Sequence, residues 1–235
     1  MTLLINDRFD ISATLIVSRS FLSGSRSAQT NELILWFTNG NRFTLYLDGT
    51  NTPAMVIPSI ADNAWHHITW RRAGNQSCIF TNGVQRGCNT TSNKTLAIES
   101  LILGQEQDSL GGNFDINQDW ESLVDELLIF RSALTNTEIL SVYNNQNAGN
   151  TWNGGTRSCL TTPPQPPVVD YSYADWRFDE LNYSGAANEI IDQQGTHHGF
   201  ATNANPVPGK ICNAIDLTAS TSSDRANLGA GSING

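Results

Sequence analysis

Short segments in which apolar and polar residues alternate follow one another along most of the chain, separated by Gly, Asn, Asp and Pro. A two-residue period of this kind predicts β-strands that bury one face. We expect strands at residues 11–17, 32–37, 42–47, 55–57, 65–72, 77–81, 84–86, 96–103 and 125–130. Asn82 and Gly83 stand between two of them and are a strong hairpin signal. The chain is therefore expected to be an all-β protein with an antiparallel jelly-roll β-sandwich.

A single short helix is expected after the last of these strands, near residues 135–146. Thr135 is followed three positions later by Glu138, the pattern of a capping box at the start of a helix. Ile139, Val142 and Tyr143 then recur at helical spacing, so one face of this helix would be apolar.

The charge balance restricts the kinds of partner. The sequence holds 22 acidic and 13 basic residues, a net charge of -9, which disfavours binding to nucleic acid and to anionic membranes. No apolar run approaches the roughly 18 residues that a membrane-spanning helix requires. The opening residues lack the parts of a signal peptide, so any export signal would lie outside this chain. Few Lys and many Asn, Thr, Ser and Gly residues favour an extracellular or cell-surface domain.

An acidic loop at residues 103–118 predicts a metal site. Its oxygen-bearing side chains include Glu106, Gln107, Asp108, Asp115 and Gln118. Ca²⁺ takes about six to eight oxygen ligands from carboxylates, amides, backbone carbonyls and water, and this loop offers all of these. Three carboxylates in so short a segment repel one another unless a cation neutralises them. A hydrated acidic loop without a metal is the alternative interpretation.

A longer segment around this loop resembles the signature region of the pentraxins, a family of calcium-dependent lectins. The resemblance extends over residues 101–139, which read LILGQEQDSLGGNFDINQDWESLVDELLIFRSALTNTEI. It implies a calcium centre with carboxylates from Glu106 and Asp108 and a backbone carbonyl from Gln107. Asp115 and Gln118 would complete a second calcium position. A wider resemblance to laminin G-like jelly rolls of the concanavalin A-like lectin superfamily covers residues 8–148.

The same resemblance adds two residues from an earlier part of the chain. Asn31 matches a family ligand that comes just before a strand, although Thr30 stands where the pentraxins have Asp. Trp36 resembles the aromatic residue that the family places beside the calcium-bound ligand. We therefore expect Asn31 to bind calcium and Trp36 to contact the ligand.

The domain organisation expected from the sequence has three parts. Residues 1–160 resemble a pentraxin or laminin G-like jelly roll without its first strands, and residues 161–172 form a Pro-rich linker. Residues 173–235 resemble the opening strands of a second laminin G-like unit. Such units occur in tandem in bacterial surface proteins and in proteins of mannose-sensitive haemagglutinin pilus biogenesis. This last segment either completes the first unit, within one chain or between chains, or belongs to a truncated second domain.

The four cysteines allow three pairings. Cys78 and Cys88 flank the Asn82-Gly83 turn and nearly face each other across the expected hairpin, so a disulfide between them is expected. Cys159 and Cys212 would then pair across the linker. Four buried free thiols are the alternative, but an even number in an extracellular chain favours disulfides.

The expected function is calcium-dependent, lectin-like binding of anionic or polyhydroxy groups, such as phosphocholine or glycans, without catalysis. The partners would be such a ligand and either further copies of the chain or a neighbouring repeat. One alternative is a structural or adhesion repeat without ligand chemistry. Another is a glycan hydrolase, which needs two carboxylates flanking the scissile bond. Glu121, Asp125 and Glu126 come nearest to that pattern but have the wrong spacing.

Overall fold

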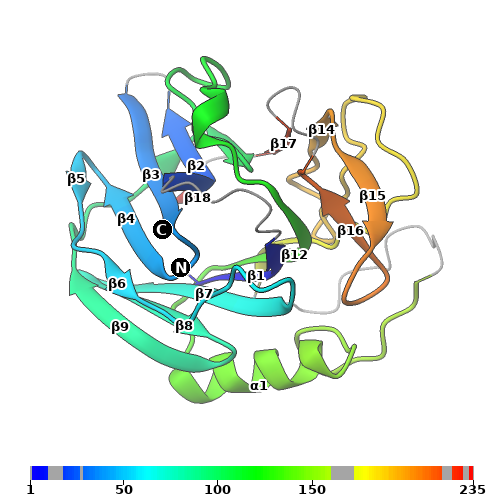
Figure 1. Ribbon diagram of the computed structural model, residues 1–235, viewed down its shortest axis with the longest axis horizontal. Coiled ribbons are helices and arrows are strands. Elements are labelled where there is room, and N and C mark those ends of the chain that lie inside the picture. The colour runs from blue at the N-terminus through cyan, green and yellow to red at the C-terminus, as the bar shows by residue number, and fades with distance from the viewer. Residues whose placement is uncertain are drawn as a thin grey trace.

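The described part of the chain folds into two large antiparallel sheets that pack face to face, with one α-helix outside them (Figure 1). The computed structural model describes residues 2–9, 18–26, 29–159, 172–218, 224–229 and 233–234. The first sheet has the strand order β15-β16-β12-β1-β7-β8-β9, and β13 also pairs with β12. The second sheet has the order β14-β17-β11-β2-β3-β4-β5, and β6 also pairs with β4. This architecture confirms the expected jelly-roll sandwich.

The strands have the following bounds. The first sheet contains β1 (Thr2–Phe9), β7 (Trp65–Ala73), β8 (Gln76–Thr81), β9 (Val84–Thr90), β12 (Ser122–Phe130), β13 (Ser172–Trp176), β15 (Asn205–Pro208) and β16 (Asn213–Asp216). The second sheet contains β2 (Ser18–Arg26), β3 (Gln29–Thr38), β4 (Arg42–Leu47), β5 (Thr50–Asn51), β6 (Met55–Val56), β11 (Ser100–Leu103), β14 (Phe200–Thr202) and β17 (Arg225–Leu228). A separate pair is formed by β10 (Ala97–Ile98) and β18 (Ile233–Asn234), and the helices are α1 (Asn136–Asn147) and η1 (Ile116–Gln118).

Most strands lie where the alternation places them, with three differences. The strand expected at 96–103 is divided into β10 and β11 by Glu99. The strand expected at 11–17 lies outside the described residues. The alternation did not predict β1 and β2, yet β1 is central to the first sheet, between β12 and β7. The unit therefore has strands before residue 30 that the sequence pattern did not reveal.

The β8–β9 hairpin confirms the local signals in the sequence. Asn82 has φ 50° and Gly83 has φ 75°, and two left-handed residues in succession form the turn that matches the twist of a hairpin. Cys78 pairs in register with Cys88, and a disulfide joins them with a Cα–Cα distance of 4.0 Å. The expected disulfide across this hairpin is therefore present.

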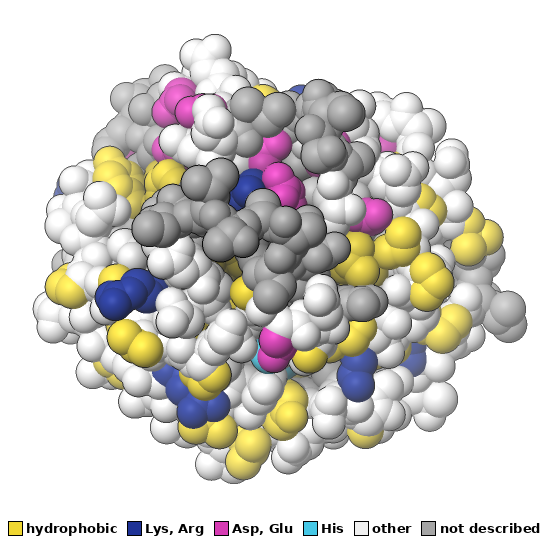
Figure 2. Space-filling model, viewed as in Figure 1, with side chains coloured by type: hydrophobic (Ala, Val, Ile, Leu, Met, Phe, Trp, Pro, Cys, Tyr) yellow, Lys and Arg dark blue, Asp and Glu magenta, His cyan; other side chains and the backbone are white. Residues whose placement is uncertain are grey.

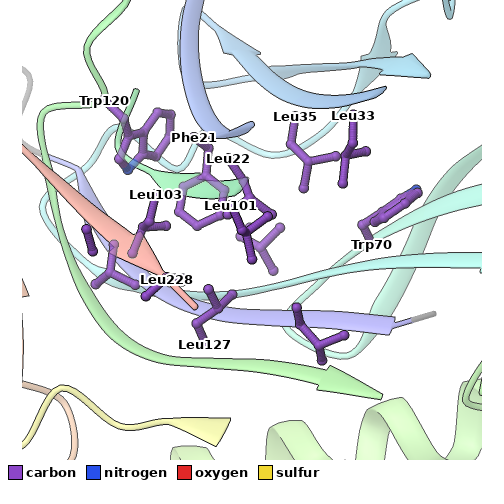
Figure 3. Packing of buried hydrophobic residues seen from close by; sticks show 14 of the residues in the cluster. Phe21, Leu22, Leu33, Leu35, Trp70, Leu101, Leu103, Trp120, Leu127 and Leu228 are labelled. Atoms are coloured by element: carbon purple, nitrogen blue, oxygen red, sulfur yellow. The ribbon is translucent and has the colours of Figure 1, made fainter. Parts of the chain in front are cut away.

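The main core lies between the two sheets, and the alternation along β3 shows which face is buried. Leu33, Leu35 and Phe37 belong to the core cluster. Figure 3 shows side chains from both sheets converging there, including Leu33, Leu35, Trp70 and Leu127. Because side chains alternate along a strand, Ile34 and Trp36 point to the opposite, outer face of the second sheet. That outer face carries the acidic loop.

The helix α1 covers the outer face of the first sheet, below β8 and β9 in Figure 1. Ile139 packs with Phe80, and Val142 packs with other residues of the first sheet in a second small cluster. The expected capping box is present: the Glu138 amide donates to Thr135 Oγ1 at 3.2 Å, and the Thr135 amide donates to Glu138 Oε2 at 2.7 Å. The helix expected near 135–146 is therefore confirmed.

Strands from the C-terminal part of the chain extend both sheets. β13 and β16 pair with β12, and β17 pairs with β11. Trp176 and Ile215 belong to the same core cluster as the N-terminal strands, and a second disulfide joins Cys159 to Cys212. The expected linker falls almost entirely outside the described residues. Whether residues 173–235 complete the first unit or begin a second one stays a prediction.

Two apolar residues of this C-terminal part lie outside regular strands. Phe178 follows the end of β13 with a left-handed φ of 55°. Ile190 forms an isolated bridge with Gly199 instead of belonging to a strand. Both side chains are nevertheless fully buried, so the apolar pattern located the core even where it did not give the backbone conformation.

Candidate metal centre

The acidic loop begins where β11 ends and folds over the outer face of the second sheet. Ser23 lies on this face, because it pairs in register with Ile34. The Gln107 side-chain amide donates to Ser23 O at 3.1 Å and to Ser100 O at 3.2 Å. Ser23 Oγ in turn donates to Gln105 O at 2.9 Å. These buried hydrogen bonds attach the start of the loop to the strand beneath it.

The loop then turns back on itself at its two glycines. The Ser109 and Gly112 backbones exchange hydrogen bonds of 3.2 and 3.0 Å. Gly111 has φ +67°, which a residue without a Cβ adopts without strain. Its amide donates to Gln107 Oε1 at 2.9 Å. One glutamine side chain therefore ties the turn to the sheet and leaves its own backbone carbonyl available for other roles.

The second half of the loop is ordered by Asp115. This residue caps the short helix η1, and its Oδ1 accepts from the Asn117 amide at 2.9 Å and from Asn117 Nδ2 at 2.8 Å. The Gln118 amide donates to Asp115 O at 2.9 Å. Asp115 and Gln118, which the sequence placed in one metal position, are thus held on a single helical turn.

The predicted ligands differ in their exposure. Glu106 is buried and Asp108 is exposed. Gln118 Oε1 is buried and accepts no hydrogen bond, and an unpaired buried oxygen of this kind is where an ion or water would be accommodated. The available donors are all oxygens, as Ca²⁺ prefers. The side chain of Asn31, in β3, lies outside the described part of the structure.

The carboxylates are not gathered at one point. Within the part of the chain that the structure describes, no group of three or more His, Cys, Asp or Glu side chains is placed to hold a metal ion. The donor types fit calcium, but a bound ion would also need amide, carbonyl and water oxygens for its coordination shell. The assignment of Glu106, Gln107, Asp108, Asp115 and Gln118 as ligands stays a prediction.

A further carboxylate beside the loop was not predicted from the sequence. Asp119 Oδ1 is buried without a hydrogen-bond partner. Burial and the nearby Asp224 together raise the pKa of Asp119 to about 7, although Arg19 opposes the shift. Asp119 directly follows the predicted ligand Gln118, so its position in the sequence could have identified it as part of this site. Nothing in the sequence connects Asp224, which directly precedes β17, to this loop.

Two basic residues border the acidic loop and hold it in place. Arg19 donates to Asp119 O at 2.8 Å and to Glu121 Oε1 at 3.0 Å. The Arg225 guanidinium lies 4.1 Å from the centre of the Phe114 ring, a cation–π contact. In Figure 2, acidic side chains gather around a basic one in the upper middle of the molecule, where Figure 1 places β17.

Trp36 lies on the same outer face as the loop. It pairs in register with Ser20 and Thr44, and its side chain is half-buried. An aromatic ring on this face could contact a ligand held near the loop, so the position agrees with the predicted role. The role itself stays a prediction.

Comparison with known proteins places these features in a family. Residues 5–153, more than half of the chain, match the sequence profile of the Pentaxin family. Serum amyloid P-component of Mesocricetus auratus is 31% identical over 119 residues, which are 48% of this chain and 49% of that protein. C-reactive protein of Rattus norvegicus is 32% identical over 140 residues, 54% of this chain and 57% of that protein. The chain spans about half the length of the curated relatives it matches.

Solved structures share the fold at low identity. A native heptameric pentraxin from Limulus polyphemus, similar to serum amyloid P-component, superposes with a TM-score of 0.54 and 20% identity, covering 72% of this chain and 75% of that one. A candidate carbohydrate-binding protein from Bacteroides ovatus superposes with a TM-score of 0.52 and 11% identity, covering 92% of this chain and 51% of that one. These likenesses establish the fold. The expected likeness to tandem units of bacterial surface and pilus proteins stays a prediction.

Proposed function

The chain belongs to the pentaxin (pentraxin) family, and we propose that it is a calcium-dependent binding module that recognises anionic or polyhydroxy groups such as phosphocholine or glycans. One observation carries the proposal: the acidic loop is fastened by buried hydrogen bonds onto the outer face of the sheet, with Gln118 Oε1 buried and unpaired beside it. Rigid, oxygen-rich surroundings with unsatisfied acceptors favour a hard cation.

In this proposal the ion is held by the carboxylates of Glu106, Asp108 and Asp115, the backbone carbonyl of Gln107 and the side-chain oxygen of Gln118. Calcium with free coordination positions would attract phosphate, carboxylate or hydroxyl oxygens of a ligand. The protein's own part is to hold the loop and to present Trp36 on the same face. The side chain of Asn31 would add a further amide oxygen from β3.

The proposal assigns binding and no catalysis, because the loop supplies oxygen ligands of the kind that suits a cation. It also assigns an extracellular or cell-surface location. The named relatives include a serum protein, and the chain has two disulfides, which form and persist in oxidising surroundings. No helix in the described residues is long and apolar enough to cross a membrane. Self-association is part of the proposal, since one structural relative is a heptamer.

Calorimetric titration with CaCl₂ tests the metal. We expect the full chain to bind Ca²⁺, and Glu106→Gln to weaken binding at least about tenfold, since it removes a charged ligand. Glu99→Gln, a matched change at an exposed position just before β11, should leave binding unchanged. Equal calcium affinity in wild type and Glu106→Gln would contradict the assigned ligands.

Binding of immobilised phosphocholine, with calcium and then with EDTA, tests the ligand. We expect retention with calcium only, and weaker retention after Trp36→Ala. A protein that binds calcium in calorimetry could still retain neither phosphocholine nor any glycan in a calcium-dependent way. That result would favour a structural role for the ion.

A further inference from the structure

A surface pocket of about 510 Å³ opens at the β14 edge of the second sheet, in the C-terminal part of the chain. Its volume lies within the roughly 300–1,000 Å³ of small-molecule sites. Its lining includes Tyr183, Phe200, Thr202, Asn203, Asn205 and Asp224. None of these residues belongs to the predicted calcium centre or was singled out from the sequence as a ligand contact.

Strand register shows which lining residues share a face with the acidic loop. Ala201 pairs with Ala226, and both belong to the core cluster. Their strand neighbours therefore point outward. Phe200 pairs with Asn227, and Asn227 pairs with Ile102. Ile102 pairs with Ser23, which lies under the acidic loop. Phe200 and Thr202 thus line the pocket from the outer face, toward the opposite edge of the sheet from Trp36, and Ala201 and Ala204 line it from the core side.

One wall of the pocket is rigidly held by Glu189. Its carboxylate accepts from the Ser184 amide at 2.6 Å, the Gly185 amide at 2.9 Å and the Ala201 amide at 3.0 Å. Burial raises the pKa of Glu189, but the hydrogen bonds from Ser184 and Ala201 lower it overall, so the carboxylate stays ionised at neutral pH. The edge of β14 and the loop beside it are therefore fixed before any ligand arrives, which reduces the entropic cost of binding.

The chemistry of the lining points to an uncharged ligand with many hydroxyl groups. The Tyr183 hydroxyl already donates to Glu180 Oε2 at 3.1 Å, so Tyr183 and Phe200 contribute aromatic rings to the lining. Thr202, Asn203 and Asn205 add a hydroxyl and two amides, which can donate and accept. Among the described lining residues none is basic, and Asp224 would repel an anion.

We propose that this pocket binds a neutral saccharide residue and does so without calcium. Apolar ring faces match the C–H faces of a sugar, and the amides match its hydroxyl groups. The pocket contains none of the predicted calcium ligands, so this site goes beyond the proposed function and does not depend on it. A glycan that lies across the outer face could occupy both places.

An array of neutral and acidic glycans, probed with the full oxidised chain in EDTA, tests the proposal. We expect neutral oligosaccharides to be retained, and calorimetry with the retained sugar to give the affinity. Asn203→Gly should weaken binding about 5- to 10-fold, because it removes one polar partner. Glycine tolerates the left-handed φ of 55° at this position. Phe200→Ala should weaken binding about tenfold or more through loss of the ring.

Asn39→Gly is the matched control, because Asn39 is exposed, has φ 54° and lies in the β3–β4 turn, outside the lining. It should leave sugar affinity unchanged, and thermal unfolding should show that all variants are folded. Three results would overturn the proposal: no neutral glycan retained up to about 10 mM, retention of acidic glycans alone, or an affinity that neither Asn203→Gly nor Phe200→Ala alters. Because all measurements are made in EDTA, failure here leaves the calcium proposal untouched.

Discussion

Replacement of Trp176 by Ala tests whether the C-terminal strands belong to the same folding unit as the N-terminal ones. The Trp176 side chain is fully buried in the core cluster that the N-terminal strands also form. Its β13 backbone pairs with Leu127 of β12, and its Nε1 donates to His197 O at 2.7 Å. Loss of this one side chain should therefore destabilise the strands on both sides of the linker.

The expected cost can be worked from these contacts. Truncation of a buried Trp to Ala costs about 3–5 kcal/mol through lost burial and the cavity left behind. The lost hydrogen bond leaves a buried carbonyl unpaired, which adds about 1 kcal/mol. The sum of about 4–6 kcal/mol is a large part of the roughly 5–15 kcal/mol that stabilises a typical domain. For a chain of this size it lowers Tm by about 10–20 °C.

Urea unfolding of the oxidised full chain, followed by far-UV circular dichroism, measures the effect. We expect one transition in both proteins, shifted to lower urea in Trp176→Ala. Trp36→Ala is the control: that side chain is half-buried on the outer face, so its loss should cost less than about 2 kcal/mol. The reasoning would be refuted if urea produced two transitions and Trp176→Ala shifted only the one at lower urea. That result would show that residues 173–235 unfold separately.

Three further outcomes are expected. Burial lowers the pKa of His67 from 6.5 to about 4, against the influence of the neighbouring Gln146 side chain, which raises it. As the pH falls, His67 is protonated in the unfolded chain before it is protonated in the folded one. The free energy of unfolding should therefore fall by roughly 3 kcal/mol between pH 6.5 and 4. His67→Leu should remove most of that slope in urea titrations at several pH values, and an unchanged slope would contradict the assignment. Serine replacement of Cys159 and Cys212, which are 53 residues apart, should lower the free energy of unfolding by about 4 kcal/mol. The same replacement of Cys78 and Cys88, which are 10 residues apart, should lower it by about 3 kcal/mol, because the closed loop is shorter. A larger loss for the Cys78–Cys88 pair would contradict this. Saturating Ca²⁺ should raise Tm in differential scanning fluorimetry by mass action, and no rise would count against a site in the folded state.

The features that the sequence predicted well depend on neighbours along the chain. The Asn82-Gly83 turn fixes the β8–β9 hairpin, and the hairpin brings Cys78 opposite Cys88. The capping box of Thr135 and Glu138 starts α1. In each case the interacting residues lie within about ten positions of one another, so local geometry alone decides the outcome.

The acidic loop shows where local reasoning ends. Its residue types and spacing were sufficient to propose calcium ligands, and the capping role of Asp115 on η1 follows from a short contact. The anchoring of Gln107 on Ser23 joins positions 84 residues apart. The approach of Asp224 to Asp119 requires β17 to pair with β11. Neither contact leaves a periodic signal in the sequence.

The sequence by itself determined the all-β class, the one helix, the hairpin disulfide and the oxygen-rich loop, because alternation, capping and turn chemistry act over a few residues. Only the tertiary structure decided that β1 lies between β12 and β7 and that the C-terminal strands extend both sheets. It also decided that the pocket beside Phe200 lies at the β14 edge of the sheet whose outer face carries the acidic loop. Strand order and register are set by which buried faces fit together across the whole chain, and that long-range fit is not encoded in any single segment.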